Sequence, residues 1–179
     1  MTAEADNVPE LLTARIRMRG FRLDDFEDLA AMWADPAVVR YISGTPQPRS
    51  QSWERLLRYF GHWKALRFGS WAVEDRESGA FIGGVGFSAN KREITPSLEA
   101  WPEIGWTLIP AVHGRGLASE AVAAALVWAD VHLSADRTVC IFDPQHAASI
   151  RVAEKNGYRE MGMGDYLGHP ALIMERQRP

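Results

Sequence analysis

The sequence has 179 residues, of which 46% are apolar and 24% are charged, which fits one globular domain, expected over residues 11–177 after a flexible tail at residues 1–10. Its formal net charge of −3 argues against a general nucleic-acid-binding protein, because affinity for phosphates requires clustered Lys and Arg. A single cysteine, Cys140, excludes an internal disulfide, and no Cys/His pair has the spacing of a zinc site.

The N-terminal part predicts a strand followed by two helices. Apolar and basic residues alternate over Leu12–Arg19, which is the pattern of a half-buried strand. A helix follows, with Asp24 and Asp25 near the positive end of its dipole and with Pro36 as its end. After a loop at residues 44–48, a second and longer helix is predicted by one continuous apolar face, formed by Trp53, Leu56, Leu57, Phe60 and Trp63.

The rest of the chain predicts six strands and two helices. Strands at residues 70–74 and 81–87 form a hairpin through a turn at residues 77–79. A strand at residues 103–109 leads through a glycine loop into an alanine-rich helix at residues 118–132. A strand, a helix that ends at Gly157 and two more strands follow, at residues 138–142, 148–156, 158–163 and 171–175. The predicted order is β-α-α-β-β-β-α-β-α-β-β.

The loop before the alanine-rich helix is a candidate binding site. Gly114 and Gly116 let the backbone come close to a ligand, and the free amides at the helix start point outward from the positive end of the dipole. A pyrophosphate fits this arrangement, and Arg115 adds a positive charge. Tight turns also use glycine for steric reasons, so the loop alone leaves both interpretations open. A nucleotide P-loop is excluded because no Gly-Lys-Ser/Thr follows, and the dinucleotide fingerprint would need a glycine at Ser119.

The same loop resembles the signature of the GCN5-related N-acetyltransferases (GNAT), Gln/Arg-x-x-Gly-x-Gly/Ala. Its fixed places fall on His113, Gly116 and Ala118, of which the last two match. The wider run, residues 103–121, is similar to the RimJ/RimL-type branch, which acetylates the N-termini of ribosomal proteins. Residues 148–158 resemble the second signature of that branch, a Ser-Ile-Arg helix before Lys-x-Gly-Phe/Tyr.

Further positions both support and qualify this resemblance. The branch tends to open with Thr-x-Arg-x-x-x-Arg, which Thr13, Arg15 and Arg19 match. His113 replaces the usual first residue of the loop signature. His146 stands where the family usually has the Asn that contacts the pantetheine arm, so that contact is in question.

The resemblance covers residues 12–176 and implies an α/β (α+β) GNAT fold, with a central, mixed, mostly antiparallel twisted sheet of about seven strands flanked by about four helices. It implies that acetyl-CoA is the acyl donor and that its pantetheine arm lies between the splayed fourth and fifth strands. There it pairs with the backbone of Leu108 and Ile109, where an amide polarises the thioester carbonyl. The other expected contacts with the cofactor are His113, Gly114, Arg115, Gly116, Leu117, Ala118, Ser119, His146, Arg151 and Lys155. For Arg151 and Lys155, the structural alternative is a pair of solvated charges on a helix.

Two side chains are candidate catalytic residues. An amine must lose a proton before it attacks, and Glu103 is the expected base, directly or through water, with Glu99 in reserve. The structural alternative for Glu103 is a salt bridge. By resemblance, Ser149 protonates the departing thiolate, with Tyr166 as a weaker donor, although such a serine also caps helix starts. Cys140 lies in an apolar strand, so we expect direct transfer without an acyl-cysteine.

Three functions stay open from the sequence. The first is acetyl transfer to a primary amine, on a protein N-terminus or a small molecule. The second keeps the fold with an aminoglycoside or polyamine acceptor, although such cations favour an acidic cleft and no dense acidic cluster is evident. The third is a non-catalytic sensor that binds coenzyme A, which the departures at His113 and His146 keep open.

Acceptor, assembly and location are less defined. Trp101 and Trp106 are candidates to line the acceptor pocket, with core packing as the alternative, and a homodimer is left open. No metal is expected. Residues 1–9 lack the apolar centre of a signal peptide, and no apolar run is long enough to cross a bilayer. We therefore expect a cytoplasmic protein without membrane or nucleic-acid partners.

Overall fold

The structure is a computed structural model that describes residues 8–179. Its strands are β1 (Leu11–Leu12), β2 (Ile16–Gly20), β3 (Ser70–Asp75), β4 (Phe81–Ser88), β5 (Ile94–Thr95), β6 (Glu103–Leu108), β7 (Arg137–Phe142), β8 (Arg159–Tyr166) and β9 (His169–Gln177). Its α-helices are α1 (Phe26–Ala34), α2 (Pro36–Val39), α3 (Arg49–Leu66), α4 (Leu117–His132) and α5 (Ala147–Lys155).

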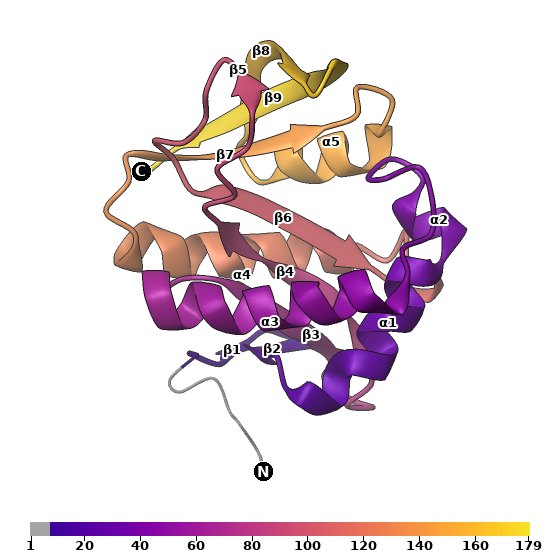
Figure 1. Cartoon of the computed structure of the whole chain (residues 1–179). Coiled ribbons are helices and arrows are strands. Elements are labelled where there is room, and N and C mark those ends of the chain that lie inside the picture. Colours follow the sequence, from indigo (N-terminus) through magenta and orange to yellow (C-terminus); the bar gives the residue numbers. More distant parts are fainter. Residues whose placement is uncertain (1–7) are drawn as a thin grey trace.

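The strands form one sheet in the order β1-β2-β3-β4-β6-β7-β9-β8-β5 (Figure 1). Neighbouring strands are antiparallel, except that β6 and β7 run parallel. The expected α/β fold with a mixed, mostly antiparallel sheet is confirmed. Within residues 8–179 the sheet has nine strands instead of about seven, and there are five α-helices instead of about four.

The sheet carries an apolar core on each face. On β3, Trp71 and Val73 join the core that includes α4 and α5, whereas Ala72 points to the opposite face and joins the core with α1, α2 and α3. Trp71, Trp63 and Trp128 pack edge to face, with ring centroids 4.9 to 5.5 Å apart. These contacts hold α3 and α4 in place around the strands.

The N-terminal strand is interrupted, which the alternation of residues 12–19 did not reveal. Residues 13–15 leave the ladder between β1 and β2. Before them, the Pro9 carbonyl accepts a 2.8 Å hydrogen bond from Trp71 Nε1, and Glu10 forms an ion pair with Arg17. The packed chain thus begins before Leu11, and residues 1–7 of the expected tail lie outside the described residues.

Arg19, the last residue of the opening motif, is a buried structural charge. Its guanidinium contacts the carboxylates of Asp25 at 2.7 Å and Glu74 at 2.6 Å, and all three side chains are less than 10% exposed. Such a network ties β2 to β3 and to the start of α1. Removing one partner would leave a buried charge without compensation.

Two helices differ from the prediction. Pro36 does not simply end the first helix, because α1 ends at Ala34 and Pro36 is the first residue of α2. Proline suits the first position of a helix, because a backbone N–H there would have no acceptor within the helix. On α3, Trp53 and Leu57 are 40% and 46% exposed, so the expected continuous apolar face is wrong at these two residues.

The two-residue strand β5 was also not predicted. It pairs with β8 at Ile94 and Thr95 and forms the outer edge of the sheet. Two residues are too few to show a periodic pattern. In residues 8–179, no helix combines the length and the apolar character needed to cross a membrane.

Candidate active site

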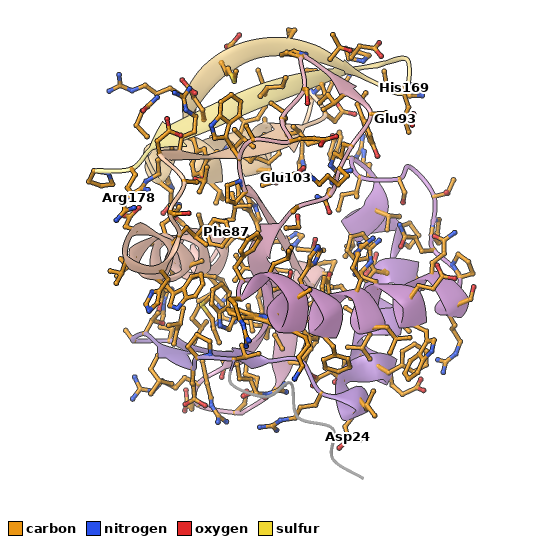
Figure 2. All side chains as sticks on the ribbon, turned by 60° about the vertical axis from the view of Figure 1, so that its left-hand side comes forward. Asp24, Phe87, Glu93, Glu103, His169 and Arg178 are labelled. Carbon is orange, nitrogen blue, oxygen red and sulfur yellow. The ribbon has the colours of Figure 1, made fainter. Side chains whose placement is uncertain are left out.

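A gap between β6 and β7 divides the sheet. Within residues 8–179 the two strands share one paired position, Glu103 opposite Val139, and then diverge. A cleft of about 790 Å³ lies along this gap, with walls from α1 and α3, from β6 and from the start of α5. Both Glu103 and His169 line the cleft. In Figure 2, Glu103 lies near the middle of the molecule and His169 near its upper edge. The predicted splayed strands are therefore β6 and β7.

The backbone of β6 presents alternate amides to this gap. The Ile109 N–H donates to the Ile82 carbonyl at 3.0 Å, on the β4 side. In an antiparallel ladder the direction alternates, so the amides of Trp106 and Leu108 point away from β4, toward β7. The Leu108 amide is therefore available to a ligand. The Ile109 amide already has an acceptor on β4, so of the two expected residues Leu108 is the one whose amide faces the gap.

The glycine loop has the geometry of an anion cradle. Gly114 and Gly116 have φ angles of 74° and 77°, in the left-handed region that favours glycine. Gly116 is the residue before α4, and the first intrahelical bond comes from the Glu120 N–H. The amides of residues 117–119 thus have no acceptor in the helix, and the exposed Arg115 lies beside them.

His113 connects this cradle to the gap. Its Nε2 lies 2.8 Å from the Leu108 carbonyl oxygen, at the end of β6. A carbonyl only accepts, so Nε2 carries the proton. The ring that departs from the family signature therefore has a defined place between the two parts of the site.

Thr13 and Arg15 of the opening motif bind the glycine loop and the first turn of α4. The Glu120 carboxylate accepts hydrogen bonds from the Thr13 hydroxyl and the Arg15 backbone, at 2.5 and 3.0 Å, and forms an ion pair with the Arg15 guanidinium at 2.6 Å. Arg15 also donates to the Arg115 carbonyl at 2.8 Å. Burial opposes the charge of Glu120, but the bonds with Thr13 and Arg15 outweigh it and lower the pKa of this carboxyl. Residues that break the first strand thereby fix the start of α4.

The two signatures are in contact where α4 begins and α5 ends. Asn156 Nδ2 donates to Ser119 Oγ at 3.2 Å and to the Val152 carbonyl at 2.8 Å, which joins the end of α5 to the cradle. Arg151 and Lys155 are exposed on α5. Their expected contact with the adenosine phosphates stays a prediction.

Ser149 and His146 form a hydrogen-bonded pair at the start of α5. Ser149 is buried, and its Oγ lies 3.3 Å from His146 Nε2. Within the described residues this is the hydroxyl's one hydrogen bond, so the expected alternative of a bond to a backbone amide is not observed. Tyr41 stacks on the His146 ring with centroids 4.7 Å apart. Burial lowers the pKa of His146, more than the nearby Asp143 raises it, so the ring is neutral at pH 7.

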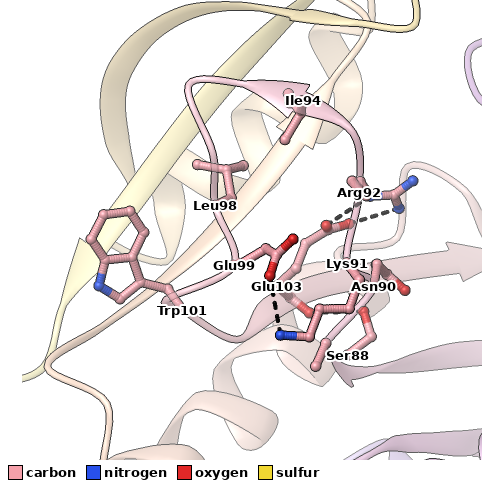
Figure 3. A pocket seen from close by; sticks show the side chains of 10 residues that line it. Ser88, Asn90, Lys91, Arg92, Ile94, Leu98, Glu99, Trp101 and Glu103 are labelled. Atoms are coloured by element: carbon pink, nitrogen blue, oxygen red, sulfur yellow. Dashed lines mark hydrogen bonds and ion pairs between the residues drawn. The ribbon is translucent and has the colours of Figure 1, made fainter.

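The Glu103 carboxylate is held by Arg92 (Figure 3). Its two oxygens accept hydrogen bonds from Arg92 at 2.8 and 2.9 Å, and Arg92 also donates to the Tyr166 hydroxyl at 3.1 Å. This is the salt bridge named as the structural alternative for Glu103, and its role as a base stays a prediction. The reserve candidate, Glu99, is exposed and pairs with Lys91 at 3.2 Å, outside the large cleft.

The remaining candidates are distributed between core and cleft. Cys140 is fully buried, and burial raises the pKa of its thiol well above the ordinary value, which fits an inert side chain. Trp106 lines the cleft and packs against Phe142, whereas Trp101 lies against Arg137 outside the cleft. Of the two tryptophans, Trp106 alone is placed to contact an acceptor.

Sequence reasoning missed a group of basic side chains in the cleft. Arg55, Arg58 and His62 lie on one face of α3 that lines the cleft, and Arg40 follows α2. Their spacing of three and four residues places them on one face of the helix. In the sequence, however, such a polar face is indistinguishable from the solvent-exposed side of an ordinary amphipathic helix. Arg92, which fixes Glu103, was missed as well.

Comparisons with known proteins agree with this geometry. The family described as Acetyltransferase (GNAT) domain matches residues 15–159. The protein YkkB of Bacillus subtilis (strain 168) is 30% identical over 174 residues, which cover 94% of this chain and 95% of YkkB. A GNAT-family acetyltransferase from Bordetella pertussis superposes with a TM-score of 0.83 and 28% identity, covering 94% of this chain and 99% of that structure.

A more distant structure comes from the RimL type. RimL, a ribosomal L7/L12 α-N-protein acetyltransferase solved in complex with coenzyme A, superposes with a TM-score of 0.78. It is 13% identical, with 94% of this chain and 98% of RimL covered, and so shares the fold. The resemblance to GNAT enzymes with RimJ/RimL-like members is confirmed.

Proposed function

Because the chain belongs to the GNAT acetyltransferase family and is therefore an acyltransferase, we propose that it transfers the acetyl group of acetyl-CoA directly to a primary amine. The observation that carries this proposal is the bond between His113 and Leu108, which joins the glycine cradle to the splayed β6–β7 pair. An anion-binding helix start and a strand with free amides thereby form one continuous site.

GNAT acetyltransferases use acetyl-CoA, and the residues present fit that substrate. The cradle at residues 114–119 suits the pyrophosphate, because its glycines bring the backbone close and its amides lack acceptors. We propose that the pantetheine arm lies between β6 and β7, where Leu108 offers its amide. Arg151 and Lys155 are proposed to meet the adenosine phosphates, and His146 the pantetheine.

The chain's own groups supply the proton transfers. We propose that the neutral His146 ring carries its proton on Nε2 and donates a hydrogen bond to Ser149 Oγ, which leaves the serine O–H free to donate to the departing sulfur. Glu103, held in place by Arg92, is proposed to accept the proton of the amine, directly or through water. The neutral amine then attacks the thioester carbonyl, and the Leu108 N–H stabilises the charge on its oxygen. When this intermediate collapses, the C–S bond breaks, the nitrogen releases its second proton to solvent and the sulfur takes up a proton from Ser149.

Two other functions use the same fold. A sensor would bind coenzyme A without turnover, but both histidines that depart from the family pattern make hydrogen bonds within the site, which supports a working site. A polyamine or aminoglycoside acceptor is disfavoured by the arginines of the cleft. Acetyl transfer to an amine without several positive charges is therefore the function that the geometry supports best.

The experiment combines binding with turnover. Acetyl-CoA binding is measured by calorimetry, and thiol release is followed over a panel of primary amines and N-terminal peptides. Binding together with amine-dependent thiol release supports the proposal. Binding without release by any amine supports the sensor, and no binding rejects both.

A further inference from the structure

We propose that the acceptor is a small primary amine that also carries an anionic group, a carboxylate or a phosphate, which Arg55 and Arg58 bind in the half of the cleft opposite α5. The inference rests on the proposed function, because it specifies the acceptor of the same site.

Arg55 is the first observation. Its guanidinium lies flat on Trp33, with Cζ 3.6 Å from the ring centroid, and donates to Gln47 Oε1 at 2.8 Å. Its Nε is buried and has no hydrogen-bond partner in the described part of the chain. Among residues 8–179, no carboxylate forms an ion pair with Arg55, so a donor and a full positive charge are left uncompensated in the cleft wall. A buried donor of this kind is costly unless a ligand completes it.

The charge of the whole cleft is the second observation. Its wall contains four arginines and two acidic residues, Glu103 and Asp143. Arg92 is paired with Glu103, which leaves three arginines against Asp143, in a chain whose net charge is −3. This concentration of positive charge opposes the overall charge and attracts anions into the cleft. Within residues 8–179, the cleft arginines that form no ion pair with a carboxylate are Arg40, Arg55 and Arg58.

The arginines also repel one another. Burial lowers the pKa of Arg55, and the charges of Arg58 and Arg92 lower it further, against the favourable effect of Tyr59. A bound anion would relieve both effects, because it offers acceptors and an opposite charge. A polyamine would add more positive charge to the same place.

A guanidinium binds carboxylate and phosphate groups with the same pair of N–H donors, so the anionic group of the acceptor can be either. Matched acceptors separate them. Tyramine and tyrosine differ by a carboxylate, ethanolamine and O-phosphoethanolamine by a phosphate, and spermidine represents the polycations. We expect kcat/KM to be at least about tenfold higher for the anionic member of one pair, the size of a charged hydrogen bond.

The variants are Arg55→Met, Arg55→Lys and Arg58→Met. Arg49→Met is the matched control, because Arg49 lies on the same helix and pairs with the exposed Glu27 outside the cleft. Arg55→Met and Arg58→Met are expected to raise KM about tenfold for the acceptor that carries the anionic group. Its kcat, and the kcat/KM of the partner that lacks this group, are expected to stay unchanged. Arg55→Lys retains part of the preference, and Arg49→Met retains all of it.

Arg55 also contacts Trp33 and Gln47, so folding is followed separately by thermal unfolding. With saturating coenzyme A to occupy the cradle, succinate or inorganic phosphate is expected to raise the melting temperature of the parent protein but not of Arg55→Met. Equal kcat/KM within both pairs, together with no anion effect on melting, overturns the inference. In that case turnover of tyramine or ethanolamine leaves the proposed function standing, whereas failure of every amine counts against that function.

Discussion

Ser149 Oγ lies 3.3 Å from His146 Nε2, so the serine of the second GNAT signature is bonded to one of the two histidines that depart from the family pattern. The pair borders the gap between β6 and β7. A substitution of either residue therefore tests the chemistry of the site.

For Ser149→Ala we expect kcat to fall about 10²-fold with acetyl-CoA affinity unchanged, because the hydroxyl helps only once charge builds on sulfur. A helix cap would instead lose about 1 kcal/mol of stability at parental kcat. Steady-state kinetics and thermal unfolding of this variant separate the two roles. Parental kcat with a lowered melting temperature rejects the catalytic role.

His146→Asn tests the buried histidine through pH. Burial lowers the pKa of His146 below its ordinary value of 6.5, so on acidification the unfolded chain takes up the proton first. The contribution of this ring to stability is therefore complete above pH 6.5 and decreases as the pH falls toward the folded pKa. Between pH 7.5 and 5.5 we expect the variant's melting temperature to drop less than the parent's. His169→Asn, at an exposed ring, is the control and should follow the parent; equal drops in all three proteins would contradict the prediction.

Gly116→Val tests the cradle. A side chain at this position meets Arg15 only at ordinary contact distance, but it faces the expected path of the pyrophosphate, and we expect affinity for acetyl-CoA to fall at least about tenfold. Because a β-branched residue at φ 77° is strained, the control is Gly79→Val, which has a similar φ of 72° in the β3–β4 turn. Calorimetry decides: equal affinity of both variants for acetyl-CoA would show that the cradle does not bind the cofactor.

Glu103→Gln tests the proposed base. The change removes basicity, so kcat is expected to fall most at low pH while acetyl-CoA affinity is kept. Loss of the charge opposite Arg92 lowers stability as well, so Glu175→Gln, which weakens the Arg137 pair outside the cleft, is the control for a broken ion pair. If the pH–rate profile of Glu103→Gln overlays that of the parent, the base is another group.

Much of the fold was predictable because its longer elements carry their own pattern. The helix from Leu117 to His132 and the strands on either side of the Asp75–Phe81 turn were predicted to within one or two residues. The two-residue strand β5 and the four-residue helix α2 are too short for any period, and they depend on tertiary pairing. Trp53 looked like a core residue but packs on the surface against Phe26, because an aromatic residue at helical spacing does not reveal which face is covered.

The site was predictable where local sequence determines the geometry. The glycine loop before the alanine-rich helix was predicted, and in the structure Gly114 and Gly116 adopt positive φ values there. The pairing of Arg92 with Glu103 and the burial of Arg55 against Trp33 were not predictable, because each depends on how distant segments pack. Charged side chains in a sequence look solvated until the fold shows which of them face a cleft.

The most direct test of acetyl transfer is a single-turnover experiment with acetyl-labelled acetyl-CoA and a reactive amine, analysed by mass spectrometry. We predict that the label appears on the amine with an equal amount of free coenzyme A, that no label is trapped on the protein, and that Cys140→Ala gives the same result. Label on Cys140 would contradict direct transfer, and label that stays on acetyl-CoA with every amine, despite binding, would contradict the enzymatic function itself.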